Sequence, residues 1–383
     1  MTPRILLIAA LGAAIAACLH FFLGGEASVS TVPLGVPAAS RAAAQSAGAS
    51  GKDAAPGNPS DAAGKKSAVN WKRFEALCNL DMDAFIPKTT PEDIARFLAK
   101  RGETPANLIT AFYATHDRRL LERALELFPN SPIVLMTALG PGPNGATPKP
   151  GEAYVPDAQR MAFIERFKVA DPNNPVPWIY SAQELFKAGQ TADAIAAIRA
   201  AQDRPAFYIY ANERMDSMQQ LYEDLGLHPL EAEVISMAGL ALPHMSAANQ
   251  SARSLMEWQK SAAESGDTAA ADDAIQLTYN LGRTFATPEA SRTLIGQLVG
   301  FSLEKRALES LLADAQPDWL PITPAQRLAE IETQKQNVST LVKEGGFDWL
   351  LKSQNEELLA EYLRRNRSDG EFSALTWLKA QKK

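Results

Sequence analysis

The sequence predicts an all-helical body, and three observations favour that fold class. Threonine–proline pairs recur, apolar residues follow them at three- and four-residue spacing, and no segment alternates convincingly with a period of two. A proline is favourable in the first helical turn because its missing N–H has no partner there, and the preceding threonine can cap the helix. We therefore expect roughly a dozen helices joined by short turns.

Helix starts and stops are marked along the body. The four start signals are Thr90-Pro91, Thr104-Pro105, Thr287-Pro288 and Thr323-Pro324. Glycines Gly102, Gly189 and Gly226 stand where helices are expected to stop, since glycine adopts the left-handed conformation that ends many helices. His116-Asp117 and His228-Pro229 are also typical of helix boundaries, and we interpret them as caps.

An apolar run at residues 5–23 precedes the body. As a helix it would be about 28 Å long at ~1.5 Å per residue, close to the ~30 Å hydrocarbon thickness of a bilayer. Arg4 precedes the run and Glu26 follows it, which favours an N-terminus in the cytoplasm and a body outside it. We expect a periplasmic or other extracytoplasmic location.

Three fates of residues 1–25 stay open. Their length and flanking charge favour a retained membrane anchor, and a cleaved signal peptide followed by secretion is the second possibility. The third is a lipoprotein, because Ile15-Ala16-Ala17-Cys18 resembles a bacterial lipobox whose cysteine, Cys18, would be acylated.

Residues 26–70 predict a disordered tether. Alanine, serine, glycine and proline make up 29 of these 45 residues, and no aromatic residue occurs among them. Such a segment cannot bury enough apolar surface to offset the entropy lost on ordering.

The composition changes from Trp71 onward, where all six tryptophans lie. The net charge of −6 comes without a basic stripe, so nucleic acid is a poor candidate as a partner. Only one cysteine, Cys78, follows the apolar run, which excludes an intrachain disulfide within the body. Packing must therefore supply the stability of the fold.

One segment, from Pro175 to Pro205, carries a helix-hairpin pattern. Its spaced residues are Trp178, Ala182, Leu185, Gly189, Ala194, Ile198 and Ala201. In this order of large and small positions the chain resembles the tetratricopeptide repeat family. The resemblance implies helical hairpins stacked as a repeat-like array over 71–226, followed by a non-periodic helical region over 227–383. A non-repeating helical bundle is the alternative.

The same resemblance implies a groove, lined by the first helix of each hairpin, that binds a protein or peptide. Within the Pro175–Pro205 unit the inward-facing candidates are Ile179, Gln183, Phe186 and Lys187. Tyr208, Tyr210 and Arg214 follow and could extend the surface with stacking and hydrogen-bonding groups. The competing interpretation is that the aromatic residues belong to the core.

No catalytic motif is evident, and we expect no catalytic residue, no metal site and no cofactor. Of the four histidines, His20 lies in the apolar run, and the other three, His116, His228 and His244, have no cysteine or glutamate at ligand spacing. Phosphate-loop and nucleophile-elbow patterns do not occur. Two function classes stay open: a membrane-tethered or exported scaffold that binds another protein in the cell envelope, and an exported helical enzyme acting on an envelope substrate. A third possibility is a compact spacer without a groove.

Overall fold

The structure, a computed structural model, describes residues 68–78, 85–140, 158–204, 207–240, 242–286 and 292–382. Over these ranges every regular element is a helix and no strand occurs, which confirms the all-helical prediction. No helix in these ranges combines the length and the apolar character needed to cross a bilayer. The apolar run at 5–23, Cys18 and most of the tether at 26–70 lie outside the described residues, so the statements about them stay predictions.

Seventeen helices make up the described part of the chain. In chain order they are α2 (Trp71–Cys78), α4 (Pro91–Arg101), α5 (Pro105–Thr115), α6 (Arg118–Leu127), α7 (Pro132–Leu139), α8 (Ala158–Ala170), α9 (Val176–Lys187), α10 (Thr191–Gln202), α11 (Ala211–Asp224), α12 (Pro229–Ala238), α13 (Pro243–Glu264), α14 (Thr268–Ala286), α15 (Leu294–Leu308), α16 (Pro324–Glu344), α17 (Phe347–Ser353), α18 (Glu356–Asp369) and α19 (Glu371–Gln381).

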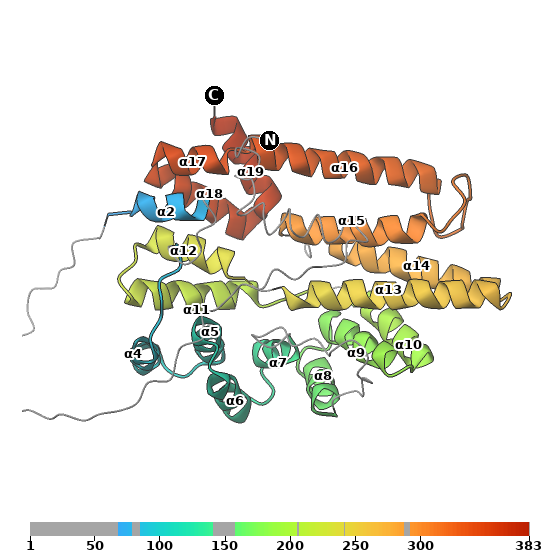
Figure 1. The fold of residues 1–383 in the computed structure, drawn as a ribbon, viewed down its shortest axis with the longest axis horizontal. Helices are drawn as coiled ribbons and strands as arrows, with labels where there is room; N and C mark the ends of the chain where they lie inside the picture. The colour runs from blue at the N-terminus through green and yellow to red at the C-terminus, as the bar shows by residue number, and fades with distance from the viewer. Residues whose placement is uncertain are drawn as a thin grey trace, which may run out of the picture.

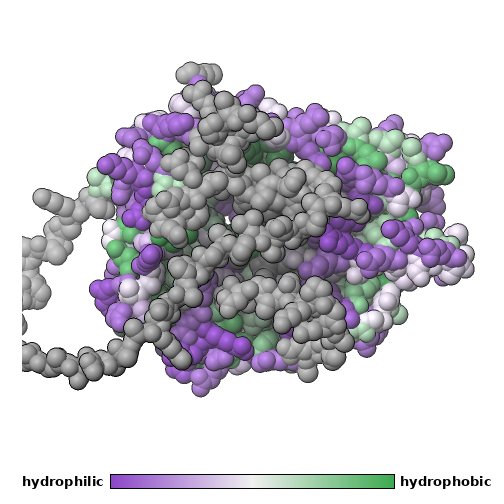
Figure 2. Space-filling view, in the orientation of Figure 1, coloured by the Kyte–Doolittle hydropathy of each residue, from purple (hydrophilic) through white to green (hydrophobic). Residues whose placement is uncertain are grey.

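Helices that follow one another in the chain pack as pairs, and the pairs are stacked (Figure 1). The pairs are α5 with α6, α7 with α8, α9 with α10, α11 with α12, α13 with α14, and α18 with α19. The helices α4 to α10 form a lower layer, α11 to α15 a middle layer, and α16 to α19 with α2 an upper layer. Contacts of α5 with α11 and of α9 with α13 join the lower layer to the middle one, and contacts of α15 with α16 join the middle layer to the upper one. Among the described residues visible in Figure 2, hydrophilic residues alternate with smaller hydrophobic patches.

The helix boundaries follow the predicted signals. Thr90, Thr104 and Thr323 cap α4, α5 and α16, and each threonine side chain accepts a hydrogen bond from a backbone N–H in the first turn. The start predicted at Thr287-Pro288 lies outside the described residues. The glycines Gly102, Gly189 and Gly226 all have positive φ angles of 83°, 73° and 87° just after helices, as predicted.

The predicted hairpin at 175–205 is present as α9 and α10. Ala182 and Ala194 are fully buried. Their small side chains let the two helices of the hairpin approach closely. The ring of Trp178 lies between two cations, with Lys168 Nζ at 4.3 Å and Arg204 Cζ at 3.9 Å from its centroid. The hairpin is confirmed, and membership of a repeat family stays a prediction.

The apolar interior continues across the predicted boundary between 226 and 227. The largest buried cluster contains residues from Leu108 on α5 to Leu303 on α15. A second cluster joins Tyr222 on α11 to Leu378 on α19. The two predicted regions therefore share their cores.

The first described residues close against the last helices. Val69, Phe74 and Phe85 are buried in the same cluster as Leu378, and α2 packs on α17. Glu231, itself buried on α12, accepts a hydrogen bond of 2.6 Å from the Asn70 N–H and forms an ion pair with Arg73 at 3.2 Å. Residues 68–70 were assigned to the tether by their composition. They belong to the folded body, because Val69 is buried in an apolar cluster and the Asn70 N–H donates a hydrogen bond to the Glu231 carboxylate.

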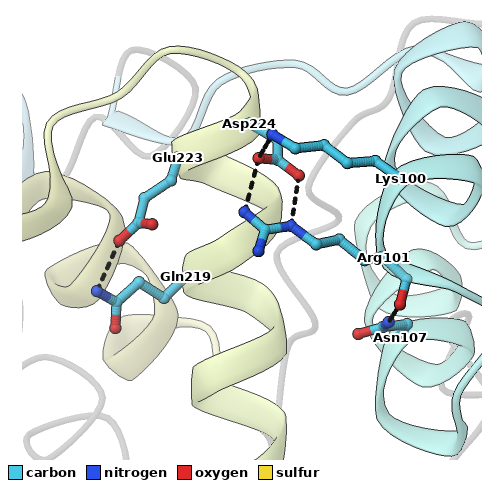
Figure 3. A network of polar contacts seen from close by, with 6 residues as sticks. All are labelled: Lys100, Arg101, Asn107, Gln219, Glu223 and Asp224. Atoms are coloured by element: carbon cyan, nitrogen blue, oxygen red, sulfur yellow. Dashed lines mark hydrogen bonds and ion pairs between the residues drawn. The ribbon is translucent and has the colours of Figure 1, made fainter. Parts of the chain in front are cut away.

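A polar network fixes the edge helix α4 against the end of α11 (Figure 3). Lys100 Nζ lies 2.6 Å from one oxygen of Asp224, and the Arg101 guanidinium binds both oxygens at 2.9 and 3.0 Å. These partners, Arg101 first, lower the pKa of Asp224. Exposed ion pairs contribute little stability, so the network mainly orients α4.

The helices α14 and α15 cross closely at two glycines. A Cβ atom added to Gly282 would lie 2.7 Å from the Glu304 backbone N and 2.8 Å from the Gly300 O. A Cβ atom added to Gly300 would lie 2.8 Å from the Gly282 O. Because backbone atoms are the obstacles, no side-chain rotation can relieve such a clash.

We expect Gly282→Ala to lower the free energy of unfolding by about 1–3 kcal/mol, as overpacking does in other cores, although alanine is the better helix former. Urea unfolding followed by circular dichroism measures the change. The control is Gly239→Ala, where the new Cβ would lie 3.4 Å from the Ile235 O of α12, the helix that it follows, and no atom of another helix lies within 4 Å. Equal stability of the two variants would contradict the tight crossing.

Candidate functional site

The four predicted site residues of α9 lie at different depths. Ile179 is fully buried in the largest cluster, and Phe186 is half-buried against it. Gln183 is buried, and its Nε2 donates a hydrogen bond of 2.6 Å to Gln250 Oε1 on α13. Lys187 is exposed and pairs with the buried Glu184 at 3.2 Å. The helix α13 covers the face of α9 that the repeat resemblance would leave open.

The three predicted residues around the start of α11 are also divided between interior and surface. Tyr208 is 43% exposed, and its hydroxyl donates a hydrogen bond of 2.7 Å to Glu213. Tyr210 is buried, has a left-handed backbone with φ 53°, and its hydroxyl donates to Asp171. Arg214 is buried with its guanidinium carbon 4.6 Å from the centroid of the Tyr113 ring. Of all seven predicted residues, only Lys187 and Tyr208 are exposed.

His244 on α13 is buried rather than poised for catalysis. Its ring stacks on Phe285 with centroids 6.1 Å apart, and it meets the ring of Phe207 in a T-shaped arrangement with centroids 5.5 Å apart. Burial, helped by the nearby Arg214, lowers the pKa of His244 to about 3, so the ring is neutral at physiological pH. Neither ring nitrogen has a hydrogen-bond partner among the described residues. His228 caps the start of α12, as predicted. The helix start predicted at His116-Asp117 is capped by Asp117, which precedes α6, whereas His116 itself follows the end of α5.

The candidate site is a cleft of about 420 Å³ in the upper half of the fold, between α14, α15, α16 and the start of α19. Its described lining residues are Arg283, Ala286, Arg292, Gln297, Phe301, Arg327, Gln334, Asn337, Val338, Asp369, Gly370, Phe372 and Ser373. We call it the arginine cleft. Its volume lies in the range of binding pockets, and its lining combines cations, amides and apolar groups.

Arg327 on α16 is held in the wall of the arginine cleft by a buried carboxylate. Its Nη2 and Nε lie 2.6 and 2.8 Å from Glu304 Oε2 on α15, and its Nη1 lies 2.9 Å from Glu330. Burial raises the pKa of Glu304, and the attraction of Arg327 opposes that rise. The charge of Arg327 is therefore largely balanced within the protein.

Arg283 and Arg292 differ from Arg327 in their surroundings. Both are exposed, and neither forms an ion pair with another described residue. Arg292 Nη1 donates a hydrogen bond of 3.1 Å to the Arg367 backbone O, which fixes its direction. Asp369 is the one carboxylate among the described lining residues. Two of the three arginines that line the arginine cleft thus have no carboxylate within ion-pair distance among the described residues.

The start of α19 is joined to the start of α15, and this junction forms the rim of the arginine cleft. The Glu371 N–H donates a hydrogen bond of 2.8 Å to the Arg292 O, and the buried Glu371 carboxylate accepts one of 2.9 Å from the Leu294 N–H. Gly370 has φ 86°, and a Cβ there would lie 3.1 Å from the Arg292 O. The junction places Phe372, which is 43% exposed, at the rim.

Sequence reasoning missed the arginine cleft because its residues are scattered over some ninety positions without a motif. Across the described part of the chain, no group of three or more histidine, cysteine, aspartate or glutamate side chains is arranged to hold a metal ion.

Comparison with known proteins gave no relative: no family model, no curated protein and no solved structure matches this chain.

We expect Arg327→Met to lower the free energy of unfolding at pH 7 by about 3–5 kcal/mol, because Glu304 becomes a buried charge without its partner. Burial already raises the pKa of Glu304, and the loss of Arg327 raises it further. The folded variant is therefore most stable at low pH, where Glu304 is protonated, and it loses stability as the pH rises through the pKa of Glu304 in the folded state. The loss should shrink when the pH falls from 7 toward 4.5, the ordinary value for glutamate. Urea unfolding at several pH values measures it.

The matched control is the double variant Glu304→Gln with Arg327→Met, which removes the buried charge. Its stability relative to the wild type should depend less on pH than that of Arg327→Met. A pH-independent loss in the single variant would contradict a charged Glu304 as its cause.

We expect Gln183→Ala to lower the free energy of unfolding by about 1 kcal/mol, since it removes a hydrogen bond between α9 and α13 and leaves Gln250 without it. Thermal unfolding measures the change. Lys187→Ala, on the exposed end of the same helix, should shift the melting temperature less, because Arg160 still pairs with the buried Glu184 at 3.1 Å. The reverse order would mean that Gln183 does not tie the two helices together.

Proposed function

We propose that the protein is a helical scaffold that binds a segment of another protein in the arginine cleft, without chemistry of its own. The observation that carries the proposal is the cleft itself, a cavity of about 420 Å³ framed by four packed helices. Its apolar floor and polar walls suit a ligand that offers both kinds of group, as a peptide does.

The frame of the arginine cleft supports this role. The glycine crossing fixes α14 against α15, the Glu304–Arg327 pair ties α15 to α16, and the Glu371 junction fixes the start of α19. A preformed site loses less entropy on binding than a flexible one, so rigid walls favour affinity. The half-exposed ring of Phe372 supplies an apolar contact at the rim, where aromatic side chains often dominate binding energy.

The predicted N-terminal segment completes the proposal. An apolar run at 5–23 would export the body or hold it at a membrane, so that the partner belongs to the cell envelope. An exported enzyme stays the alternative function. It would need titratable groups that converge on a substrate, and Asp369 is the one described carboxylate in the lining of the arginine cleft.

Site-specific photocrosslinking tests the scaffold function. A benzophenone side chain placed at Phe372 in the full chain should give a discrete crosslinked product with another protein in the membranes of the source cells. The same side chain at Val169, which is 82% exposed on α8, is the control and should not give that product. Identical products from both positions, or none from Phe372, would contradict binding in the arginine cleft.

A further inference from the structure

We infer that the segment bound in the arginine cleft is acidic, with carboxylate side chains paired to Arg283 and Arg292; this inference rests on the scaffold function proposed above. The two arginines reach one cavity from different helical regions, Arg283 from α14 and Arg292 from the residue pair that precedes α15. The chain as a whole carries a net charge of −6, so two exposed arginines without a carboxylate within ion-pair distance among the described residues stand out from the rest of the molecule.

The environment of Arg292 fits it for carboxylate binding. One of its terminal nitrogens is occupied by the Arg367 backbone O at 3.1 Å, which directs the planar guanidinium without neutralising it. A guanidinium has five N–H donors in a fixed fork, so its remaining donors can bind a carboxylate with two parallel hydrogen bonds. The Arg367 backbone carbonyl therefore orients the guanidinium of Arg292, and the ligand would supply the negative charge that pairs with it.

Arg327, in the same wall, differs from Arg283 and Arg292 in its ion pairs. Arg327 is buried and already has two carboxylate partners, Glu304 and Glu330. Arg283 and Arg292 are exposed and have no carboxylate within ion-pair distance among the described residues. The protein thus balances the buried arginine internally and leaves the two exposed ones facing the cavity and solvent.

The rest of the lining favours a peptide over a free inorganic anion. Gln334 and Asn337 lie three residues apart on α16, hence on one face, and their amides can both donate to and accept from a peptide backbone. Phe301 and Val338 form an apolar floor, and Phe372 adds an aromatic ring at the rim. A phosphate ion would leave these amide and apolar groups unused, whereas an acidic segment that also carries an apolar side chain meets all of them.

Selection from a random heptapeptide library displayed on phage tests the inference, with the full chain in detergent micelles as the target. We expect the recovered peptides to be enriched in aspartate and glutamate. A recovered acidic peptide should bind at least tenfold more tightly than its amide counterpart with Gln for Glu and Asn for Asp, and its affinity should fall as salt is raised.

The variant Arg283→Gln with Arg292→Gln should lose that preference. Its matched control is Arg96→Gln with Arg118→Gln, which removes the same charge from exposed positions on α4 and α6, in the lower layer, and should keep the preference. Recovery of peptides without acidic bias, or an unchanged preference in the cleft variant, would overturn the acidic ligand while leaving peptide binding intact. Recovery of no peptide above background would instead count against the scaffold function, on which the inference rests.

Discussion

The close crossing of α14 and α15 at Gly282 and Gly300 is the constraint on which the upper half of the structure depends. It brings the two backbones together so tightly that a single methyl group would strike backbone atoms. The same crossing sets where Glu304 lies, and Glu304 in turn directs Arg327 from α16. Two residues without side chains therefore determine the wall of a charged cavity, because a shift of α15 would move the carboxylate that holds the arginine.

Local signals were sufficient to predict the helices but not their partners. Thr90, Thr104 and Thr323 cap helices as their sequence context indicates, since capping depends on residues within one turn. The bond from Asn70 to Glu231 could not be predicted, because the two residues lie 161 positions apart, and the cluster that buries Val69 includes helices as distant as α19. The composition of residues 26–70 predicted disorder, but Val69 and Asn70 are ordered by contacts with the folded body.

For the candidate site, too, the sequence predicted local features but not which distant residues come together. Ile179 and Gln183 were expected to line an open groove because their spacing places them on one face of α9, and that face does exist. The structure covers it with α13, so Gln183 meets Gln250 instead of a partner. The arginine cleft depends on residues from four helices, and a single sequence carries no signal that Arg283, Arg292 and Phe372 share a cavity.

The packing of α2 on α17 has a consequence for biosynthesis. The first helix of the body meets its partner only after roughly 270 further residues have been made, which at about 5–20 residues per second takes on the order of 15–50 s. Until then the apolar residues of the C-terminal helices cannot bury Phe74. A nascent chain in this state is a natural client for holding chaperones, and a premature stop before α17 would leave the opening helix permanently without its cover.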